Sequence, residues 1–308
     1  MIRELLLVVL SAAAWGVQAA ESSATITILE GEALIYRGTG RLHAAEGVRL
    51  AAGDIVETGA SGFMQIELPD QSVAQFGPAT RVMLNVVTVR QKAERWFYVM
   101  NGWGKVTGSK ANPRVAPGYE VRSRLFEIPA NAAVFAFRVT PAEVTLFAER
   151  GEVRVSELQS SGPAIAVPLV LGDYYHRKAG ARGAVNPGGM QAFLSAMPRF
   201  FRDSLPLRIE RYRSEEVRAK EAPDFSYADV EVWLKAEPAV RRQFVQRWRP
   251  KVREAAFRSA LVTNLAAHPE WDPILFPEKY LPKKPPPPRP AASVPAPSVG
   301  AVTVPTDK

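Results

Sequence analysis

Short alternating segments closed by turn residues constrain the fold of this chain more than any other feature. Between about Ala24 and about Ala179, segments such as ATITIL, EALIYR, FMQIEL, VMLNVVTV, EVTLFAE and EVRVSE each end near Gly, Pro, Asn or Asp. Alternation of apolar and polar residues is the signature of a half-buried strand. Regular spacing of short strands predicts a β-sandwich, barrel or β-roll over residues 24–180, and not a parallel sheet with crossover helices.

The stretch LAAGDIVETGASGFMQIELPDQS, residues 50–72, holds four carboxylates that serve either turns or chemistry. General acid-base catalysis needs carboxylates gathered in a shielded place. From Phe63 on, however, apolar residues alternate with Gln65 and Glu67, which predicts a strand with Glu67 pointing to water. Gly accepts positive φ and Asp bonds its own backbone, so such residues favour corners. We therefore predict structural turn roles for Gly53, Asp54, Gly59 and Asp70.

The first twenty residues, MIRELLLVVLSAAAWGVQAA, have the features of a secretory signal peptide. A charged start precedes an apolar core from Leu5 to Trp15, and small residues follow at Ala19 and Ala20. The apolar core is shorter than the roughly 20 residues that a spanning helix needs. We expect a periplasmic or secreted protein, not an integral membrane protein unless this segment stays uncleaved. The chain has no cysteine, which excludes disulfides and thiol catalysis.

The net charge of +8 favours anionic partners, although a merely solvated cationic surface is the alternative. For an exported chain we expect no nucleic acid partner. An envelope protein is the expected partner, with peptidoglycan or another anionic surface polymer as the alternative.

After residues 186–190, NPGGM, the apolar period becomes helical, which predicts a helical module over residues 189–281. Ser226 and Asp229 predict an N-cap with a capping-box partner, and Pro238 and Pro250 each suit the first turn of a helix. The helix after Pro250 is expected to bury five apolar residues: Val252, Ala256, Ala260, Leu261 and Leu265. Residues 282–308 are Pro-rich, which predicts a disordered tail. The predicted fold class is therefore α+β overall.

The stretch KAEPAVRRQFVQRWRPKVREAAFR, residues 235–258, sets eight basic residues against two glutamates and interleaves aromatic rings. One interpretation is a ligand-binding surface, because arginine suits carboxylates and phosphates and aromatic faces suit sugar rings. Its residues would be Arg241, Arg242, Arg247, Trp248, Trp233 and Trp271. The other interpretation is a core-facing stripe, because Val240, Phe244, Trp248 and Val252 recur every four residues.

The segment HPEWD offers the best chemical cluster, with His268, Glu270 and Asp272 around one indole. The alternative is a helix end, where histidine suits the macrodipole and proline stops the helix. No histidine pair, acidic ligand cluster, phosphate loop or nucleophile elbow occurs in the sequence. We therefore predict no catalytic residues, no metal site and no cofactor, and hence a protein that is not an enzyme.

The segment GVRLAAGDIVETGASGFMQIELPDQSVAQFGPATRVML, residues 47–84, resembles the FecR domain. That family pattern has a Gly-Asp corner, an alternating strand, an Asp-Gly-Ser turn and a closing apolar strand. FYVMNGWGKVTG, PGYEVRS and VTLFAERGEVRVSE are similar to the later family segments, so the resemblance covers roughly residues 25–157. Two features depart from the pattern: Gln71 stands where the family usually has Gly, and EIPANAAVFAF replaces a Gly-Thr-x-Phe step.

The resemblance implies an extracytoplasmic β domain. The best-known FecR proteins are membrane-spanning regulators that couple a siderophore transporter to a sigma factor. Since no segment precedes the signal-like stretch to reach a sigma factor, we carry over the domain and not iron signalling. The helical part resembles a C-terminal extension of some proteobacterial FecR-domain proteins. We expect an exported, non-enzymatic binding, scaffold or envelope-signalling module that acts through protein contacts. The alternative is a cell-wall or anionic-glycan binder that uses the basic-aromatic helical surface.

Overall fold

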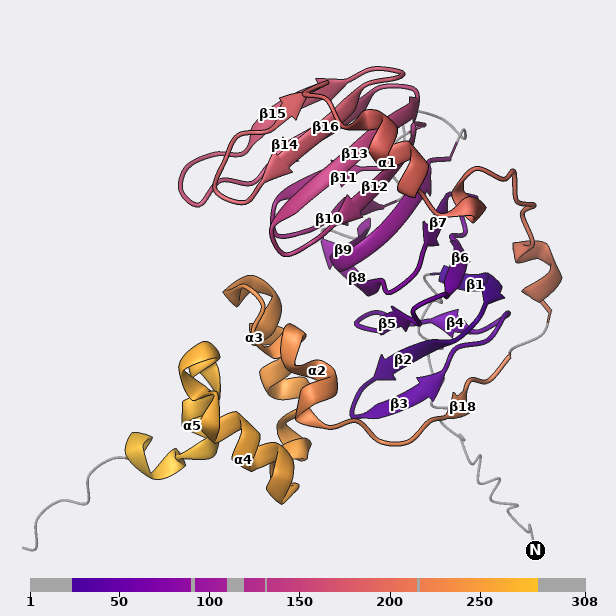
Figure 1. Cartoon of the computed structure of the whole chain (residues 1–308). Coiled ribbons are helices and arrows are strands. Elements are labelled where there is room, and N and C mark those ends of the chain that lie inside the picture. The colour runs from indigo at the N-terminus through magenta and orange to yellow at the C-terminus, as the bar shows by residue number, and fades with distance from the viewer. Residues whose placement is uncertain (1–23, 90–91, 110–118, 131, 215–216, 282–308) are drawn as a thin grey trace, which may run out of the picture.

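The computed structural model describes residues 24–89, 92–109, 119–130, 132–214 and 217–281 (Figure 1). The signal-like segment and the Pro-rich tail lie outside the described residues, so both stay predictions. Within the described part of the chain, no helix is both long enough and apolar enough to cross a membrane.

Strands dominate the first part of the chain. They are β1 (Ala24–Glu30), β2 (Ala33–Arg37), β3 (Gly40–His43), β4 (Arg49–Leu50), β5 (Ile55–Thr58), β6 (Phe63–Glu67), β7 (Val73–Phe76), β8 (Arg81–Val89), β9 (Lys92–Thr107), β10 (Glu120–Arg122), β11 (Phe126–Pro129), β12 (Val134–Val139), β13 (Glu143–Arg150), β14 (Val153–Glu157), β15 (Ile165–Leu169), β16 (Tyr174–Lys178) and β17 (Ala184–Val185).

Helices follow. They are α1 (Met190–Ala196), η1 (Arg199–Phe201), η2 (Ile209–Tyr212), α2 (Tyr227–Leu234), α3 (Pro238–Arg247), η3 (Arg249–Arg253), α4 (Ala255–Thr263), η4 (Leu265–Ala267), η5 (Pro269–Trp271), α5 (Asp272–Leu275) and η6 (Pro277–Tyr280), where η marks a 3-10 helix. One more short strand, β18 (Lys220–Glu221), pairs with β3. The structure confirms a mainly β first part followed by helices.

The strands form one curled, largely antiparallel sheet in which the long strand β9 joins two sets of strands. The first half of β9 pairs with β8 and, in parallel, with β10, whereas its second half pairs with β7 and β12. The strand changes neighbours at Gly102, whose φ is +115°. A Cβ there would lie 2.3 Å from Oγ1 of Thr80, so only glycine fits this position. The finer choice among sandwich, barrel and roll stays a prediction.

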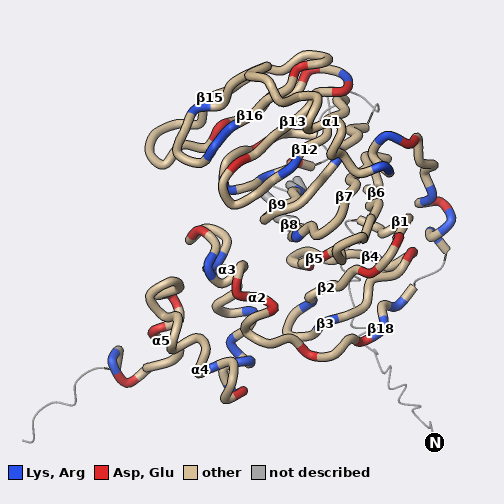
Figure 2. The backbone as a smooth tube through the Cα atoms, viewed as in Figure 1, with Lys and Arg blue, Asp and Glu red and all other residues tan. Residues whose placement is uncertain are grey.

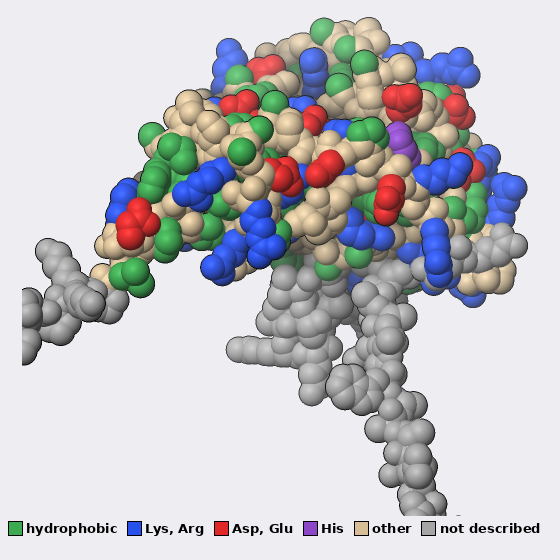
Figure 3. Space-filling model, turned by 90° about the horizontal axis from the view of Figure 1, so that it is seen from below, with side chains coloured by type: hydrophobic (Ala, Val, Ile, Leu, Met, Phe, Trp, Pro, Cys, Tyr) green, Lys and Arg blue, Asp and Glu red, His purple; other side chains and the backbone are tan. Residues whose placement is uncertain are grey.

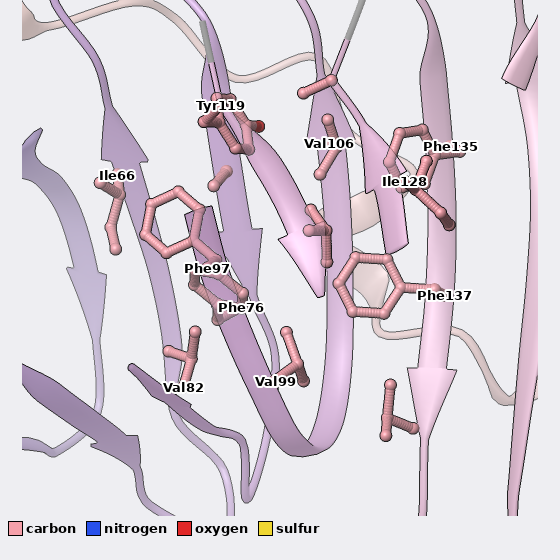
Figure 4. Close-up of a cluster of buried hydrophobic side chains, with 14 of the residues drawn as sticks. Ile66, Phe76, Val82, Phe97, Val99, Val106, Tyr119, Ile128, Phe135 and Phe137 are labelled. Carbon is pink, nitrogen blue, oxygen red and sulfur yellow. The ribbon is translucent and has the colours of Figure 1, made fainter. Parts of the chain in front are cut away.

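The main core lies inside the curl of the sheet (Figure 4). Phe97 is fully buried and meets Phe76 and Tyr119 edge-on, with ring centroids 5.4 Å and 5.2 Å apart. Aromatic pairs prefer this arrangement because the positive ring edge meets a negative ring face. These apolar side chains come from alternate positions of the strands, as the sequence pattern predicts.

One prediction about the sheet is wrong: Glu67 does not point to water. Its side chain is fully buried and its carboxylate accepts the backbone N–H groups of Arg208 and Ile209 at 2.8 Å and 3.0 Å. The Gln65 amide donates a further bond at 3.1 Å. Alternation correctly puts both residues on the outer face of β6, but a segment some 140 residues later covers that face.

The predicted capping box and the prolines in first turns are confirmed, whereas the predicted buried residues after Pro250 are corrected. Ser226 and Asp229 form the capping box at the start of α2, and Pro238 occupies the first turn of α3. Pro250 lies in the first turn of the short 3-10 helix η3, and the next α-helix starts only at Ala255. On α4 the buried residues are Phe257 and Leu261, whereas Ala256 is exposed.

Candidate functional site

The C-terminal helices pack on the β region through a second apolar core. Tyr36 of β2 meets Phe225 edge-on with ring centroids 5.5 Å apart, and Tyr98 of β9 lies 6.3 Å from Trp233 of α2. Other buried members are Ile55, Met83, Tyr227, Val230, Leu234, Phe244, Phe257, Leu261 and Leu275. This core, which we call the helix interface, fixes helices α2 and α3 against strands β2, β5, β8 and β9.

All three tryptophans that the sequence singled out lie inside the helix interface. Trp233, Trp248 and Trp271 are at most 1% exposed. The indole N–H of Trp233 donates to Glu57 at 3.3 Å, and that of Trp248 donates to the Gly38 carbonyl at 3.1 Å. In this conformation their rings offer no face to a sugar. The predicted stripe therefore faces the core: Val240 and Phe244 of α3 and the following Trp248 are buried, and Val252 of η3 is half-buried.

Arg247 joins α3 to the β region. Its guanidinium donates to the backbone carbonyls of Tyr36, Gly38 and Gly53, at 3.2 Å in the case of Gly38. Burial lowers the pKa of Arg247 to about 10, although nearby Asp54 acts in the opposite direction. The side chain remains cationic at neutral pH, and its donors are directed at the protein itself.

The last two predicted ligand residues differ in exposure. Arg241 forms an ion pair with Glu270 at 2.9 Å and donates to the Ala236 carbonyl at 3.1 Å. The Arg242 side chain is 70% exposed, and its Nε lies 3.6 Å from Glu270. The structure does not gather the six predicted residues into one surface, because only Arg242 among them is largely exposed.

The HPEWD segment does not assemble a catalytic set. His268 is fully buried, its Nε2 lies 3.1 Å from the Tyr227 hydroxyl, and burial lowers its pKa. Glu270 pairs with Arg241, whereas Asp272 accepts bonds from Lys279 at 2.8 Å and from the Tyr280 hydroxyl at 2.5 Å. Each of the three groups therefore faces a different partner.

The four predicted turn residues lie at three corners of the β region, with Gly53 and Asp54 at the same one. Gly53 has φ +84°, and the buried Asp54 beside it accepts the Ala51 N–H at 2.8 Å and forms an ion pair with Arg37 at 2.5 Å. Gly59 donates its N–H to the Glu32 carbonyl at 2.8 Å. Asp70 accepts the Ser72 N–H at 3.0 Å. These carboxylates do not converge in a shared cleft.

A groove of about 660 Å³ runs between the β region and helices α2 and α3. Its apolar lining comes from five separate segments and comprises Met100, Leu125, Val139, Pro141, Val232, Ala236 and Pro238. Ligand sites typically occupy such volumes, have mostly apolar walls and lie between structural units. We take this groove as the candidate functional site.

Every charged side chain that lines the groove, except that of Arg124, forms an ion pair or a hydrogen bond within the described part of the chain. Glu231 pairs with Lys235 at 2.6 Å, and Arg241 pairs with Glu270. The Tyr98 hydroxyl donates to Glu237, and burial together with this carboxylate raises the pKa of Tyr98 far above its usual range. Arg124 is exposed and makes no hydrogen bond or ion pair within the described part of the chain. It is therefore free to pair with an acidic group that enters the groove.

Sequence reasoning missed the groove. Arg124, Pro141 and Val232 belong to a loop, a turn and a helix far apart along the chain. No local spacing marks them as a set. The weak signal available was an apolar-basic boundary at the end of β10, where Val121 and Arg122 precede Arg124.

Comparison with known proteins identifies one family. Residues 54–154, from the residue before β5 to the start of β14, match the family model described as FecR protein. No curated protein matches the chain.

Two solved structures of a "putative anti-sigma factor from Parabacteroides distasonis ATCC 8503", at 2.50 Å and 1.65 Å resolution, are similar over part of their length. They are 14% and 15% identical to this chain, each with a TM-score of 0.35. The similar parts cover 46% of this chain, and 64% and 65% of the others, which is less than two thirds of their length.

Proposed function

Because residues 54–154 contain a FecR domain, we propose that this chain is an exported, non-enzymatic regulatory protein that acts by binding a protein partner in the cell envelope. The signal-like residues 1–20 and the resemblance to extracytoplasmic FecR domains support the export. The proposal divides the chain into that signal peptide, the β domain at residues 24–180, the helical module at 189–281 and a disordered tail at 282–308.

The observation that carries the proposal is an unpaired cation at the rim of an apolar groove. Arg124 and Leu125 come from the FecR domain, whereas Val232 and Ala236 come from α2. A partner segment with one acidic side chain opposite Arg124 and one apolar side chain on the floor fits this lining. Such a segment would contact the FecR domain and α2 at once, so its binding would depend on how these two parts are arranged.

Charge reversal at Arg124 tests the proposal in the native host. A deletion strain is complemented with the wild-type chain, with R124E, or with R154E as a matched control. Arg154 is also exposed, lies on β14 outside the groove and carries the same charge. We expect wild type and R154E to restore the envelope transcripts that the deletion changes, and R124E to fail although its protein level is normal. Full restoration by R124E would exclude the groove as the site of the proposed function.

A photo-reactive side chain at Pro141 identifies the partner directly. Pro141 is exposed and lines the groove, whereas Glu152 on the β13–β14 turn gives a control position outside it. We expect one envelope protein to be crosslinked from position 141 and not from 152, and this product to disappear in the R124E background. Equal products from both positions would contradict a specific groove contact.

Export is tested by cell fractionation and by the mass of the mature chain. Cleavage after Ala20 would leave Glu21 as the first residue of periplasmic protein. Recovery of the chain from the cytosol with its first twenty residues intact would contradict export and leave the groove experiments unaffected.

A further inference from the structure

Three arginines line a second hollow, among the C-terminal helices, that shares no residue with the groove. Arg249 and Arg253 of η3 and Arg258 of α4 line a space of about 530 Å³ together with Gln246, Pro250, Val252 and Ile274. No carboxylate belongs to this lining. We call this space the arginine hollow. Figure 2 shows basic residues along helices α3 and α4, and Figure 3 shows Lys and Arg side chains among hydrophobic ones on one face of the molecule.

The carboxylates nearest in sequence are bound to other cations. Lys251, whose side chain is only 3% exposed, pairs with Asp224 at 2.7 Å and with Glu254 at 2.8 Å. Glu270 pairs with Arg241, and Asp272 pairs with Lys279 at 2.8 Å. The acids of this part of the chain therefore do not neutralise the arginine hollow.

The three guanidinium groups are consequently left without an anionic partner. Arg249 and Arg253 are exposed and make no side-chain hydrogen bond or ion pair among the residues that the structure describes. Arg258 is half-buried and donates to the Leu275 carbonyl at 2.6 Å, which holds it at the edge of the hollow. Like charges around one hollow repel one another, and an anion placed between them relieves this repulsion.

We propose that the arginine hollow binds a phosphate-bearing anion. The planar guanidinium fork matches phosphate oxygens with two parallel hydrogen bonds, and several forks can bind different oxygens of one group. Val252 and Ile274 provide a half-buried apolar wall against which the non-phosphate part of the ligand rests. The site shares no residue with the groove, so it is independent of the proposed partner contact.

Calorimetric titration of the full chain with inorganic pyrophosphate tests the site. We expect saturable binding that weakens as salt is added, because exposed charges are screened. The double variant R249Q/R253Q should bind at least tenfold more weakly. R242Q/R154Q, which removes the same charge from exposed positions outside the hollow, should bind like wild type. Equal weakening in both double variants, or no binding by the wild type, would overturn the proposal.

A vesicle arm distinguishes the two sources of such a phosphate. Co-sedimentation with vesicles that contain phosphatidylglycerol, but not with phosphatidylcholine alone, and its loss in R249Q/R253Q would assign the ligand as a lipid headgroup. Pyrophosphate binding without co-sedimentation would assign a soluble phosphate compound. Co-sedimentation that R249Q/R253Q leaves unchanged would contradict the proposed site as the lipid contact.

Discussion

Two parts of the C-terminal chain pack on the β region, and they are held by different kinds of contact. Residues 190–213, which we call the covering segment, pack on β6 with Phe200 stacked on Phe63, ring centroids 4.6 Å apart, in an apolar cluster that also includes residues of β1, β12 and β16. Around Phe63 and Glu67 its polar contacts use its own backbone: Glu67 accepts two of its N–H groups, and Lys105 donates to the Phe201 carbonyl at 2.5 Å. Farther along, the side chains of Arg208 and Tyr212 contact Glu46 at 3.5 Å and 3.0 Å.

The helix interface uses the opposite arrangement. There the side chains of Arg247, Trp233 and Trp248 reach from the helices to carbonyls and to Glu57 of the β region. This difference shows which side chains each interface depends on. The backbone contacts of the covering segment depend on β-region side chains such as Glu67, whereas the contacts of Arg247, Trp233 and Trp248 at the helix interface depend on helical side chains. We therefore expect substitutions of β-region side chains to weaken the covering segment most, and substitutions of helical side chains to weaken the helix interface most.

The largest effect is expected at the centre of the helix interface. Trp248 stacks on Phe244 with ring centroids 4.4 Å apart and planes 10° apart, and it is fully buried. W248A removes this ring and leaves a cavity, so we expect the free energy of unfolding to fall by about 3–5 kcal/mol. Urea denaturation measures the change. Y280A removes a ring that is 59% exposed and should change stability little; a comparable loss there would contradict the assigned core.

The second prediction concerns the covering segment. E67A leaves the N–H groups of Arg208 and Ile209 without their acceptor, so we expect a loss of about 2–3 kcal/mol. R208A removes a half-buried side chain and its 3.5 Å ion pair with Glu46 but keeps its backbone N–H, so we expect a loss below about 1 kcal/mol. Hydrogen exchange at both amides should quicken in E67A and not in R208A. The reverse order would break the proposed contrast between backbone and side-chain contacts.

The acid at position 67 also marks the limit of what local sequence predicts. Alternation of β6, the capping box at Ser226 and the inward stripe of α3 all follow from spacing within one element. The cover over Glu67 and the lining of the groove depend on contacts between residues more than 100 positions apart. Residue spacing carries no information about such contacts, so the burial of Glu67 was predicted wrongly and Arg124 was missed.

The third prediction uses pH to test the helices alone. Burial lowers the pKa of His268 in the folded helices, so below its unfolded value near 6.5 the unfolded chain binds a proton that the folded chain does not. Stability should therefore fall as the pH drops below about 6.5, by at most about 1.4 kcal/mol per pH unit from this group. Urea denaturation between pH 7.5 and pH 5 should show a shallower fall in H268Q. An identical slope in both proteins would exclude His268 as the titrating group.

The smallest expected effect tests the β region away from both interfaces. Gln71 has φ +67° and donates its N–H to the Leu68 carbonyl at 2.9 Å, so it follows the Pro69–Asp70 turn in the left-handed position that favours glycine. A side chain there is strained, whereas glycine gives the unfolded chain more freedom, and the two effects partly cancel. We expect Q71G to raise the free energy of unfolding by about 0.5 kcal/mol. Q71A keeps the strained Cβ and should not raise it. If Q71G destabilised the chain, the glutamine side chain would be making a stabilising contact beside the covering segment. The stability of this turn would then depend on that segment.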